Sequence, residues 1–474
     1  MNYYDLLKQH TLRHANKMFL RIDNTAFTYA DFLAYTDGLA ERAAREVEPG
    51  QDILILADGF TRQFAAFLAL QKLGARPILA HDEHELTSIL RDNHLQGLWR
   101  FSETENDFTF TGEVIRTHKE ADILGVLSSG STGTPKVMYR TYDSWAGFFP
   151  TQNRIFDVDG NTVMFLQGSL SFTGNTNSAL SVLFEGGTIV TSEYMRCRGW
   201  GTLIEDAAVT CIYLVPAKLT LFAETVLRKH PDVASQTQNR SVSDTKSDVN
   251  LPARQSKSTI PTVKKTFPSV KSLFTGSQLL TPSVIRYLQS ILPHAKLILY
   301  YGASELNYIT YAVVDKPDRV PENLGHPFPG IGLSIKGGLI YVDTPYHVSG
   351  VKIPFSVHDT GWLNENGELI FGGRRGAWVN KGGYKLNLLK LETELKSLPG
   401  ITDAAVLTVR DKLRGEGAGV WIVKDPWTNE SQLRQTIRHF LKPADMPDFI
   451  RFIDRIPLNN RGKVDADKLR RFVD

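Results

Sequence analysis

Apolar and polar positions in the first part of the chain follow helix and strand periods in turn. Thr28 precedes a stretch with apolar residues at helical spacing, which predicts a helix with Thr28 as its N-cap. The apolar run at 52–56 predicts a buried strand, 60–73 predicts a helix that ends at Gly74, and 77–79 predicts the next strand. Strand, helix and strand at this spacing form a βαβ unit, so the sequence predicts a parallel sheet.

The same periods continue through the rest of the chain. Further strands are predicted at 137–140, 163–166 and 297–300, and helices at 142–149 and from 282 onward. Residues 389–395 and 430–441 predict helices, and 404–409 and 419–423 predict strands, in a small C-terminal unit. The predicted fold class is therefore α/β, with a large multi-layer N-terminal domain of βαβ sheets (residues 1–373) and a small α+β C-terminal domain (residues 376–474).

Composition limits the class of protein. The 474 residues exceed what one hydrophobic core usually organises, so at least two domains are expected. The net charge of +3 is too small to indicate nucleic acid or an anionic membrane as a partner. Cys197 and Cys211 provide neither a disulfide framework nor a metal-ligand spacing, and the N-terminus lacks the apolar core of a signal peptide. Since no apolar run could span a bilayer, the sequence predicts a cytoplasmic protein without a transmembrane segment.

Residues 233–265 differ in composition from the rest of the chain. They contain few large apolar side chains and many polar and charged ones, so they cannot offset the entropy lost on ordering. We expect a disordered surface insertion that is inert rather than regulatory.

The stretch L-S-S-G-S-T-G-T-P-K, residues 127–136, has the composition of a phosphate-binding loop that leaves a strand. Its glycines allow positive φ and bring N–H groups close to an anion, its hydroxyls add donors, and Lys136 adds a mobile positive charge. It is not a Walker A motif, because the spacing G-x-x-x-x-G-K-[ST] is absent. The predicted phosphate-binding residues are Ser128, Ser129, Gly130, Ser131, Thr132, Gly133, Thr134 and Lys136.

Further motifs follow this loop along the chain. They are Y-G-A-S-E at 301–305, N-L-G-H-P-F-P-G at 323–330, H-D-T-G-W-L at 358–363, G-R-R-G at 373–376 and P-L-N-N-R-G-K at 457–463. Together with S-S-G-S-T-G-T-P-K, they resemble the motifs of the AMP-forming acid–thiol ligases: acyl-CoA synthetases, luciferases and the adenylation domains of peptide synthetases. The resemblance covers nearly the whole chain and is greatest to a free-standing acyl-CoA synthetase.

The resemblance implies a nucleotide site and assigns its residues. Glu305, Lys136 and Lys463 are implied as catalytic: Glu305 holds Mg²⁺, and Lys463 bridges the carboxylate and the α-phosphate. Tyr301 offers a flat face to adenine, and the Asp359 carboxylate can accept hydrogen bonds from both ribose hydroxyls. The other residues implied for the nucleotide are Gly276, Ser277, Gly302, Ser304 and Arg374.

The resemblance also implies that the C-terminal domain is a mobile lid. Gly376 stands where the family has an Asp or Lys at the hinge between the domains, and glycine allows a wide range of φ and ψ there. Lys381, Gly382 and Gly383 match the loop that faces the thiol.

Two departures from the family pattern bear on function: the first leaves the acid undefined, and both allow a nucleotide-binding homologue that no longer ligates. The segment before G-G-T usually carries a histidine beside an aromatic residue, whereas this chain has Ser169, Ser171 and Phe172 and no histidine. Val137 follows the loop lysine where the family usually has glycine.

The implied reaction is ATP-dependent adenylation of a small-molecule carboxylic acid with release of pyrophosphate, followed by acyl transfer to a thiol. ATP, Mg²⁺ and coenzyme A are the implied cofactors, with coenzyme A favoured because the chain resembles a free-standing enzyme. Two alternatives remain open: transfer to the phosphopantetheine of an acyl or peptidyl carrier protein, and a nucleotide-binding homologue that no longer ligates.

Overall fold

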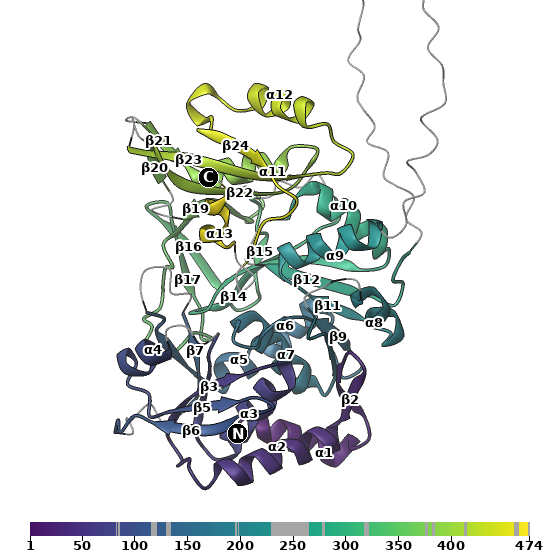
Figure 1. Cartoon of the computed structure of the whole chain (residues 1–474), viewed down its shortest axis with the longest axis vertical. Helices are drawn as coiled ribbons and strands as arrows, with labels where there is room; N and C mark the ends of the chain where they lie inside the picture. The colour runs from purple at the N-terminus through teal and green to yellow at the C-terminus, as the bar shows by residue number, and fades with distance from the viewer. Residues whose placement is uncertain are drawn as a thin grey trace, which may run out of the picture.

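The computed structural model describes residues 1–81, 83, 86–114, 121–128, 134–194, 197, 199–228, 265–276, 280–316, 322–374, 378–381, 384–411, 415–458 and 464–472. Within these ranges the chain forms four β-sheets with helices packed around them (Figure 1). The N-terminal elements lie at one end of the molecule and the C-terminal sheet at the other, and the predicted α/β fold class is confirmed.

A six-stranded sheet is built from the N-terminal part of the chain. Its order is β6 (Asn106–Phe110), β5 (Gly97–Phe101), β3 (Asp52–Ala57), β4 (Arg76–Leu79), β7 (Asp122–Leu127), β8 (Val137–Thr141). The four central strands are parallel, because helical crossovers connect β3, β4 and β5, and both edge strands pair antiparallel. The predicted βαβ unit is thereby confirmed.

A nine-stranded sheet combines two strands from the start of the chain with seven strands from residues 163–327. Its order is β15 (His326–Pro327), β14 (Asn307–Val313), β13 (Lys296–Ala303), β12 (Ser272–Gly276), β11 (Cys211–Tyr213), β9 (Val163–Leu166), β10 (Thr188–Thr191), β1 (Met18–Ile22), β2 (Thr25–Thr28). The strands from β13 to β1 are parallel, so their carboxyl ends meet along one edge, where polar loops gather.

An antiparallel sheet and a mixed sheet follow in the C-terminal half. The first has the order β16 (Gly332–Lys336), β17 (Leu339–Asp343), β18 (Asp359–Leu363), β19 (Leu369–Arg374). The second contains β21 (Tyr384–Asn387), β20 (Trp378–Lys381), β23 (Gly415–Lys424), β22 (Ile401–Asp411) and β24 (Phe449–Phe452). A short 3₁₀ helix at Pro443–Asp445 precedes β24.

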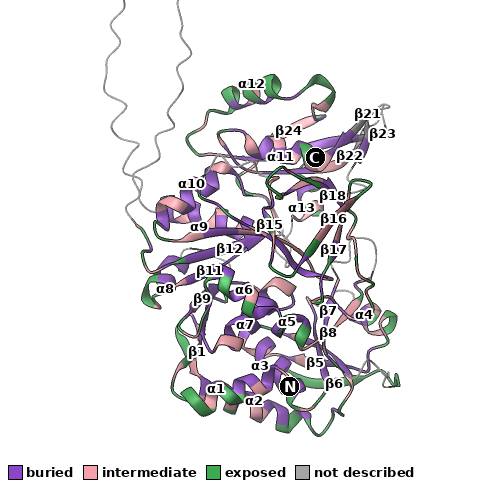
Figure 2. Ribbon diagram, turned by 180° about the vertical axis from the view of Figure 1, so that it is seen from behind, coloured by how far each residue is buried: buried purple, intermediate pink, exposed green. Residues whose placement is uncertain are grey.

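The helices bury their apolar faces against these sheets. They are α1 (Tyr3–His14), α2 (Tyr29–Ala43), α3 (Phe60–Lys72), α4 (Leu86–Asp92), α5 (Asp143–Ala146), α6 (Phe149–Phe156), α7 (Thr173–Glu185), α8 (Trp200–Asp206), α9 (Pro216–Arg228), α10 (Pro282–Ile291), α11 (Leu388–Ser397), α12 (Glu430–Phe440) and α13 (Ala466–Arg471). Helices α3 and α7 are almost entirely buried in the core between the two large sheets (Figure 2). Among the described residues, no helix has the length and apolar character needed to cross a bilayer.

The C-terminal sheet has a core of its own and docks on α10. Helices α11 and α12 cover one face of the sheet, and Leu469 of α13 is buried at the other. Two hydrogen bonds join the sheet to α10 and its cap: Thr281 Oγ1 donates to the carbonyl of Thr402 at 3.2 Å, and Tyr287 Oη donates to Asp425.

Two local predictions are wrong. The single helix predicted over 142–149 is two helices, α5 and α6, because Pro150 lacks an N–H and cannot continue the hydrogen-bond ladder of α5. The strand predicted at 297–300 ends too early, because β14 folds back and pairs with the first three residues of the motif Y-G-A-S-E, which continue β13. The predicted insertion at 233–264 lies outside the described residues, whereas Lys265 is described and pairs with Glu205 at 2.8 Å.

Candidate active site

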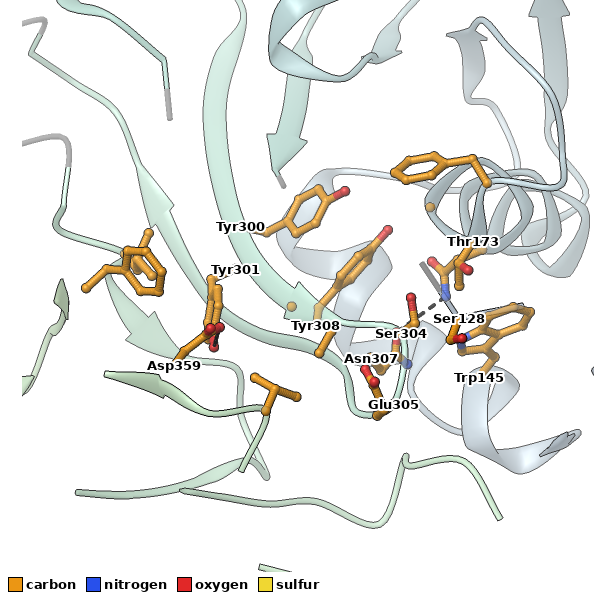
Figure 3. Close-up of a pocket in the computed structure, with 18 of the residues that line it drawn as sticks. Ser128, Trp145, Thr173, Tyr300, Tyr301, Ser304, Glu305, Asn307, Tyr308 and Asp359 are labelled. Carbon is orange, nitrogen blue, oxygen red and sulfur yellow. Dashed lines mark hydrogen bonds between the residues drawn. The ribbon is translucent and has the colours of Figure 1, made fainter. Parts of the chain in front are cut away.

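A cavity of about 390 Å³ lies where the sheets meet (Figure 3). Its walls come from the end of β7, from β8, from the first turn of α7, from the β13–β14 hairpin, from β18 and β19, and from α11 of the C-terminal part. Six of the residues predicted from the sequence line it: Ser128, Tyr301, Gly302, Ser304, Glu305 and Asp359. Segments that are far apart along the chain therefore share one cavity.

Tyr301 and Asp359 lie together at one side of the cavity (Figure 3). Tyr301 Oη donates to Asp359 Oδ2 at 2.7 Å, and Asp359 is 9% exposed. The Tyr301 ring lies 6.0 Å from the ring of Phe371, measured between centroids. In the β18–β19 pairing, Asp359 stands opposite Arg374, whose backbone is described. An aromatic face and a buried carboxylate thus adjoin at this side of the cavity.

The turn after β13 presents Ser304 and Glu305 to the cavity. Gly302 is needed before it, because a Cβ there would stand 2.6 Å from the carbonyl oxygen of Asn307. The backbone of Glu305 is held by the N–H of Val348 at 2.9 Å. Glu305 lines the cavity, and its carboxylate makes no hydrogen bond or ion pair with another described residue.

These residues fit a Mg²⁺ ion that a nucleotide brings with it. Mg²⁺ prefers oxygen ligands and is usually bound through one or two carboxylates together with substrate phosphates and water. Glu305 supplies such a carboxylate at the cavity wall. No group of three or more His, Cys, Asp or Glu side chains that could hold a metal occurs among the described residues.

The predicted phosphate loop is described at its two ends. Ser128 and Lys136 close it: the Ser128 N–H donates to the Lys136 carbonyl, and the Lys136 N–H donates to Ser128 Oγ, both at 2.8 Å. Thr134 hydrogen-bonds to Asp92, whose pKa is lowered first by Arg91 and then by Thr134. Neither Thr134 nor Lys136 is a lining residue of the cavity, and Lys136 is exposed. The predicted residues Ser129, Gly130, Ser131, Thr132 and Gly133 lie outside the described residues.

Other predicted residues are partly described or not described. Gly276 ends β12 against the ring and carbonyl of Tyr300, so a side chain there would collide with it. Lys381 is described as backbone in β20, where it pairs with Tyr384 and Gly415. The described structure does not include Ser277, Gly376, Gly382, Gly383 and Lys463.

Arg140 is a cavity residue that the sequence analysis missed. It is fully buried in β8, and its Nη2 donates to the Ser304 carbonyl at 2.6 Å. The Trp145 ring centroid lies 4.8 Å from the guanidinium carbon. Burial lowers the pKa of Arg140 to about 10, while Tyr3 and Glu305 act to raise it, so the side chain is a cation at neutral pH. An arginine at the end of the strand predicted at 137–140 was the signal that could have revealed it.

A second buried cation lies in the first turn of α9. Lys218 of α9 is 8% exposed, and its Nζ donates to the Gln167 carbonyl at 2.7 Å. Burial lowers the pKa of Lys218 from 10.5 to about 8, which Cys197 partly opposes. No carboxylate lies within ion-pair distance of Lys218 in the described part of the chain.

A histidine reaches the serine-rich segment from elsewhere in the chain. Residues 169–172 contain none, as the sequence showed, but His81 Nδ1 lies 2.8 Å from Ser171 Oγ. Ser171 Oγ lies 2.7 Å from Ser169 Oγ, which donates to Gln63 Oε1 at 3.1 Å. His81 follows β4, whose carboxyl end meets the same edge of the sheet as the start of the phosphate loop.

Family models match most of the chain. The model of the AMP-binding enzymes matches residues 84–344, and the model of the AMP-binding enzyme C-terminal domain matches residues 390–463. An acyl–CoA ligase of Bacillus subtilis strain 168 is 24% identical over 366 residues, which are 73% of this chain and 68% of the relative. The 2,3-dihydroxybenzoate-AMP ligase of the same strain is 22% identical over 516 residues, covering 99% of this chain and 93% of the relative.

Solved structures share the fold. The o-succinylbenzoate CoA synthetase of Bacillus subtilis, solved with its acyl-adenylate intermediate, superposes with a TM-score of 0.75 at 17% identity, covering 98% of this chain and 97% of that one. ATP-bound MatB from Rhodopseudomonas palustris superposes with a TM-score of 0.73 at 19% identity, covering 100% of this chain and 99% of that one.

Proposed function

Because this chain belongs to the family of AMP-binding enzymes, we propose that it is a ligase that joins a carboxylic acid to a thiol and converts ATP to AMP and pyrophosphate. In the first step, a carboxylate oxygen of the acid attacks the α-phosphorus of ATP. A mixed anhydride, acyl-AMP, forms, and pyrophosphate leaves with the electron pair of the broken P–O bond.

The first step needs charge stabilisation more than proton transfer. Asp359 would accept hydrogen bonds from the ribose, Tyr301 would stack on adenine, and Ser304 would donate to the α-phosphate. Mg²⁺ bound to Glu305 and the phosphates would neutralise negative charge there. Lys463 would bridge the acid and the α-phosphate as charge moves to pyrophosphate, and Lys136 would pair with the outer phosphates.

In the second step, a thiolate attacks the acyl carbon, the C–O bond to AMP breaks, and a thioester and AMP form. Coenzyme A is the favoured thiol, and the phosphopantetheine of a carrier protein is the alternative. Rotation at Gly376 would carry Lys463 away and bring the Lys381–Gly382–Gly383 loop to the cavity.

One observation carries this proposal. The hydrogen bond from Tyr301 to Asp359 joins two motifs 58 positions apart, at the cavity that Glu305 and Ser128 also line. An aromatic face, a buried acceptor and a carboxylate that no described residue pairs with lie in one cavity, and these are groups that adenosine and a Mg²⁺-bound phosphate chain can use.

The test is ATP–pyrophosphate exchange across a panel of carboxylic acids, followed by thioester formation with coenzyme A and with a phosphopantetheinylated carrier protein. We expect acid-dependent exchange, and thioester formation with coenzyme A. Thioester formation with the carrier alone would favour the alternative acceptor. If ATP raises the melting temperature but no acid supports exchange, the chain is a nucleotide-binding homologue that does not ligate.

A further inference from the structure

A row of hydrogen bonds along the cavity wall ends in an unused acceptor. Arg140 Nη1 donates to Ser144 Oγ at 3.3 Å, the Ser144 carbonyl accepts from Asn307 Nδ2 at 3.4 Å, and Asn307 Oδ1 accepts from Asn177 Nδ2 at 3.5 Å. Asn177 lines the cavity and is 2% exposed. Its Oδ1 has no hydrogen-bond partner in the described part of the chain.

The backbone carbonyl of Ser144 fixes the direction of this row. A carbonyl can only accept, so the amide of Asn307 must turn its NH₂ toward it and its oxygen toward Asn177. Asn177 must then turn its own NH₂ toward Asn307, which leaves its oxygen as the free atom. A buried acceptor without a partner is costly, so a ligand that supplies an O–H or N–H would be bound selectively.

The row also leaves a donor at its other end. Arg140 Nε is buried, and no described residue accepts a hydrogen bond from it. Arg140 and Asn177 both line the cavity, so its wall holds a cation whose Nε has no acceptor among the described residues and an amide oxygen that has no donor among them.

Tyrosine rings close the cavity beside α7. Tyr300 and Tyr308 line it with ring centroids 4.3 Å apart, and Tyr213, which is fully buried, lies behind them with its Oη 3.1 Å from that of Tyr300. The hydroxyls of Tyr300 and Tyr308 point toward the side where Thr173 lies (Figure 3). Tyr213 Oη also fills the space next to Gly174. A long alkyl chain would have to displace these packed rings.

We propose that the acid taken by this cavity is compact, carries a hydroxyl or amino group, and is recognised at that group by Asn177. The inference rests on the proposed function, because it concerns the acid that is adenylated. It separates this chain from ligases of long unbranched fatty acids.

The test compares acids in matched pairs by their kcat/KM in ATP–pyrophosphate exchange. Suitable pairs are benzoate with its 2-hydroxy and 2-amino derivatives, and butanoate with 2-hydroxybutanoate, with palmitate as the long-chain acid. For at least one pair, we expect the substituted acid to exceed its parent by about tenfold or more, because a site built around a hydrogen bond rejects the analogue that lacks it. Palmitate should support no exchange.

Two substitutions at Asn177 test its role. Asn177→Leu removes the acceptor, so the kcat/KM of the substituted acid should become nearly equal to that of its parent. Asn177→Asp keeps an acceptor and should preserve a preference for the substituted acid. Asn161→Leu, at an exposed turn, is the matched control and should keep the wild-type ratio. KM and kcat are also measured separately, because a loss of folded protein lowers the apparent kcat for both acids of a pair and leaves their KM values unchanged.

The outcomes separate this inference from the proposed function. Exchange that is fastest with palmitate or with the unsubstituted acids overturns the inference and leaves the ligase function standing. An unchanged ratio in folded Asn177→Leu likewise overturns the role of Asn177. Absence of exchange with every acid, in a protein that unfolds cooperatively, overturns the proposed function itself.

Discussion

Replacing Lys218 with methionine should stabilise the protein at neutral pH. The Lys218 ammonium is 8% exposed and has one hydrogen-bond acceptor in the described structure, the Gln167 carbonyl at 2.7 Å. Its burial lowers the pKa from 10.5 to about 8. Methionine has a similar length, carries no charge and adapts to irregular apolar space, so the substitution removes the buried charge without opening a large cavity.

The size and pH dependence of the effect follow from the two pKa values. Between about pH 8 and 10.5 the unfolded chain holds a proton on Lys218 that the folded chain has lost, so the stability of the native protein rises with pH through this window. At about 1.4 kcal/mol for each pH unit, the free energy of unfolding rises by about 3 kcal/mol across this window. Below pH 8 the wild type has none of this gain, because Lys218 is protonated in both states. Loss of the hydrogen bond to Gln167 opposes this gain by about 1 kcal/mol, so the variant should be about 2 kcal/mol more stable near pH 7.

Urea unfolding at several pH values measures the prediction. The advantage of Lys218→Met should shrink by about 2 kcal/mol between about pH 7.5 and 9.5, because the wild type loses its buried charge over that range. Lys8→Met, on the exposed face of α1, is the control and should differ from the wild type by the same amount at every pH. A stability difference for Lys218→Met that does not change with pH would refute the reasoning.

Three further predictions concern catalysis. Arg140→Met should lower acid-dependent exchange about 10- to 100-fold, because a charge-assisted hydrogen bond to the Ser304 carbonyl contributes about 1.5–3 kcal/mol. The exchange rate of Arg140→Lys should lie between those of Arg140→Met and the wild type. Equal rates for Arg140→Lys and the wild type would show that the guanidinium fork is not needed. Lys463→Ala should fold and bind ATP but lose most adenylation, since the lysine acts chiefly in the transition state; near-normal pyrophosphate exchange would contradict its role. Gly376→Pro should keep exchange within several-fold of the wild type but lose most thioester formation, because proline fixes φ and restricts rotation at this position. Parallel loss of both activities would show that Gly376 is not a selective hinge.

The elements that the sequence predicted correctly depend on signals only a few residues apart. Thr28 and Asp31 cap the start of α2 reciprocally, through two hydrogen bonds between positions three apart. Leu433 and Ile437 are buried on one face of α12, as their spacing predicted. Motif order also predicted the family, because each motif is a local pattern that can be recognised without knowing what it contacts.

The features that the sequence did not predict depend on partners far along the chain. Arg140 meets Ser304 from 164 positions away, His81 meets Ser171 from 90, and Lys218 meets Gln167 from 51. Periodicity shows that a strand or helix is buried, but it does not show which distant backbone carbonyl a buried cation will reach. The side-chain oxygen of Asn177, which has no partner among the described residues, is a similar case, since its orientation depends on Asn307 and on a carbonyl in α5.

The distribution of the cavity walls along the chain sets the order in which a nascent polypeptide can complete them. All strands of the six-stranded sheet have been synthesised once Thr141 has emerged from the ribosome, and so has Ser128. Glu392, which also lines the cavity, is made roughly 260 residues later, which takes some tens of seconds at about 5–20 residues per second. A chain synthesised only as far as β8 therefore has every strand of the six-stranded sheet but an incomplete cavity, and it lacks the β18 carboxylate and the α11 wall until Asp359 and Glu392 have been made. Activation of the acid would begin only when the last walls arrive, so unfinished chains would consume no nucleotide.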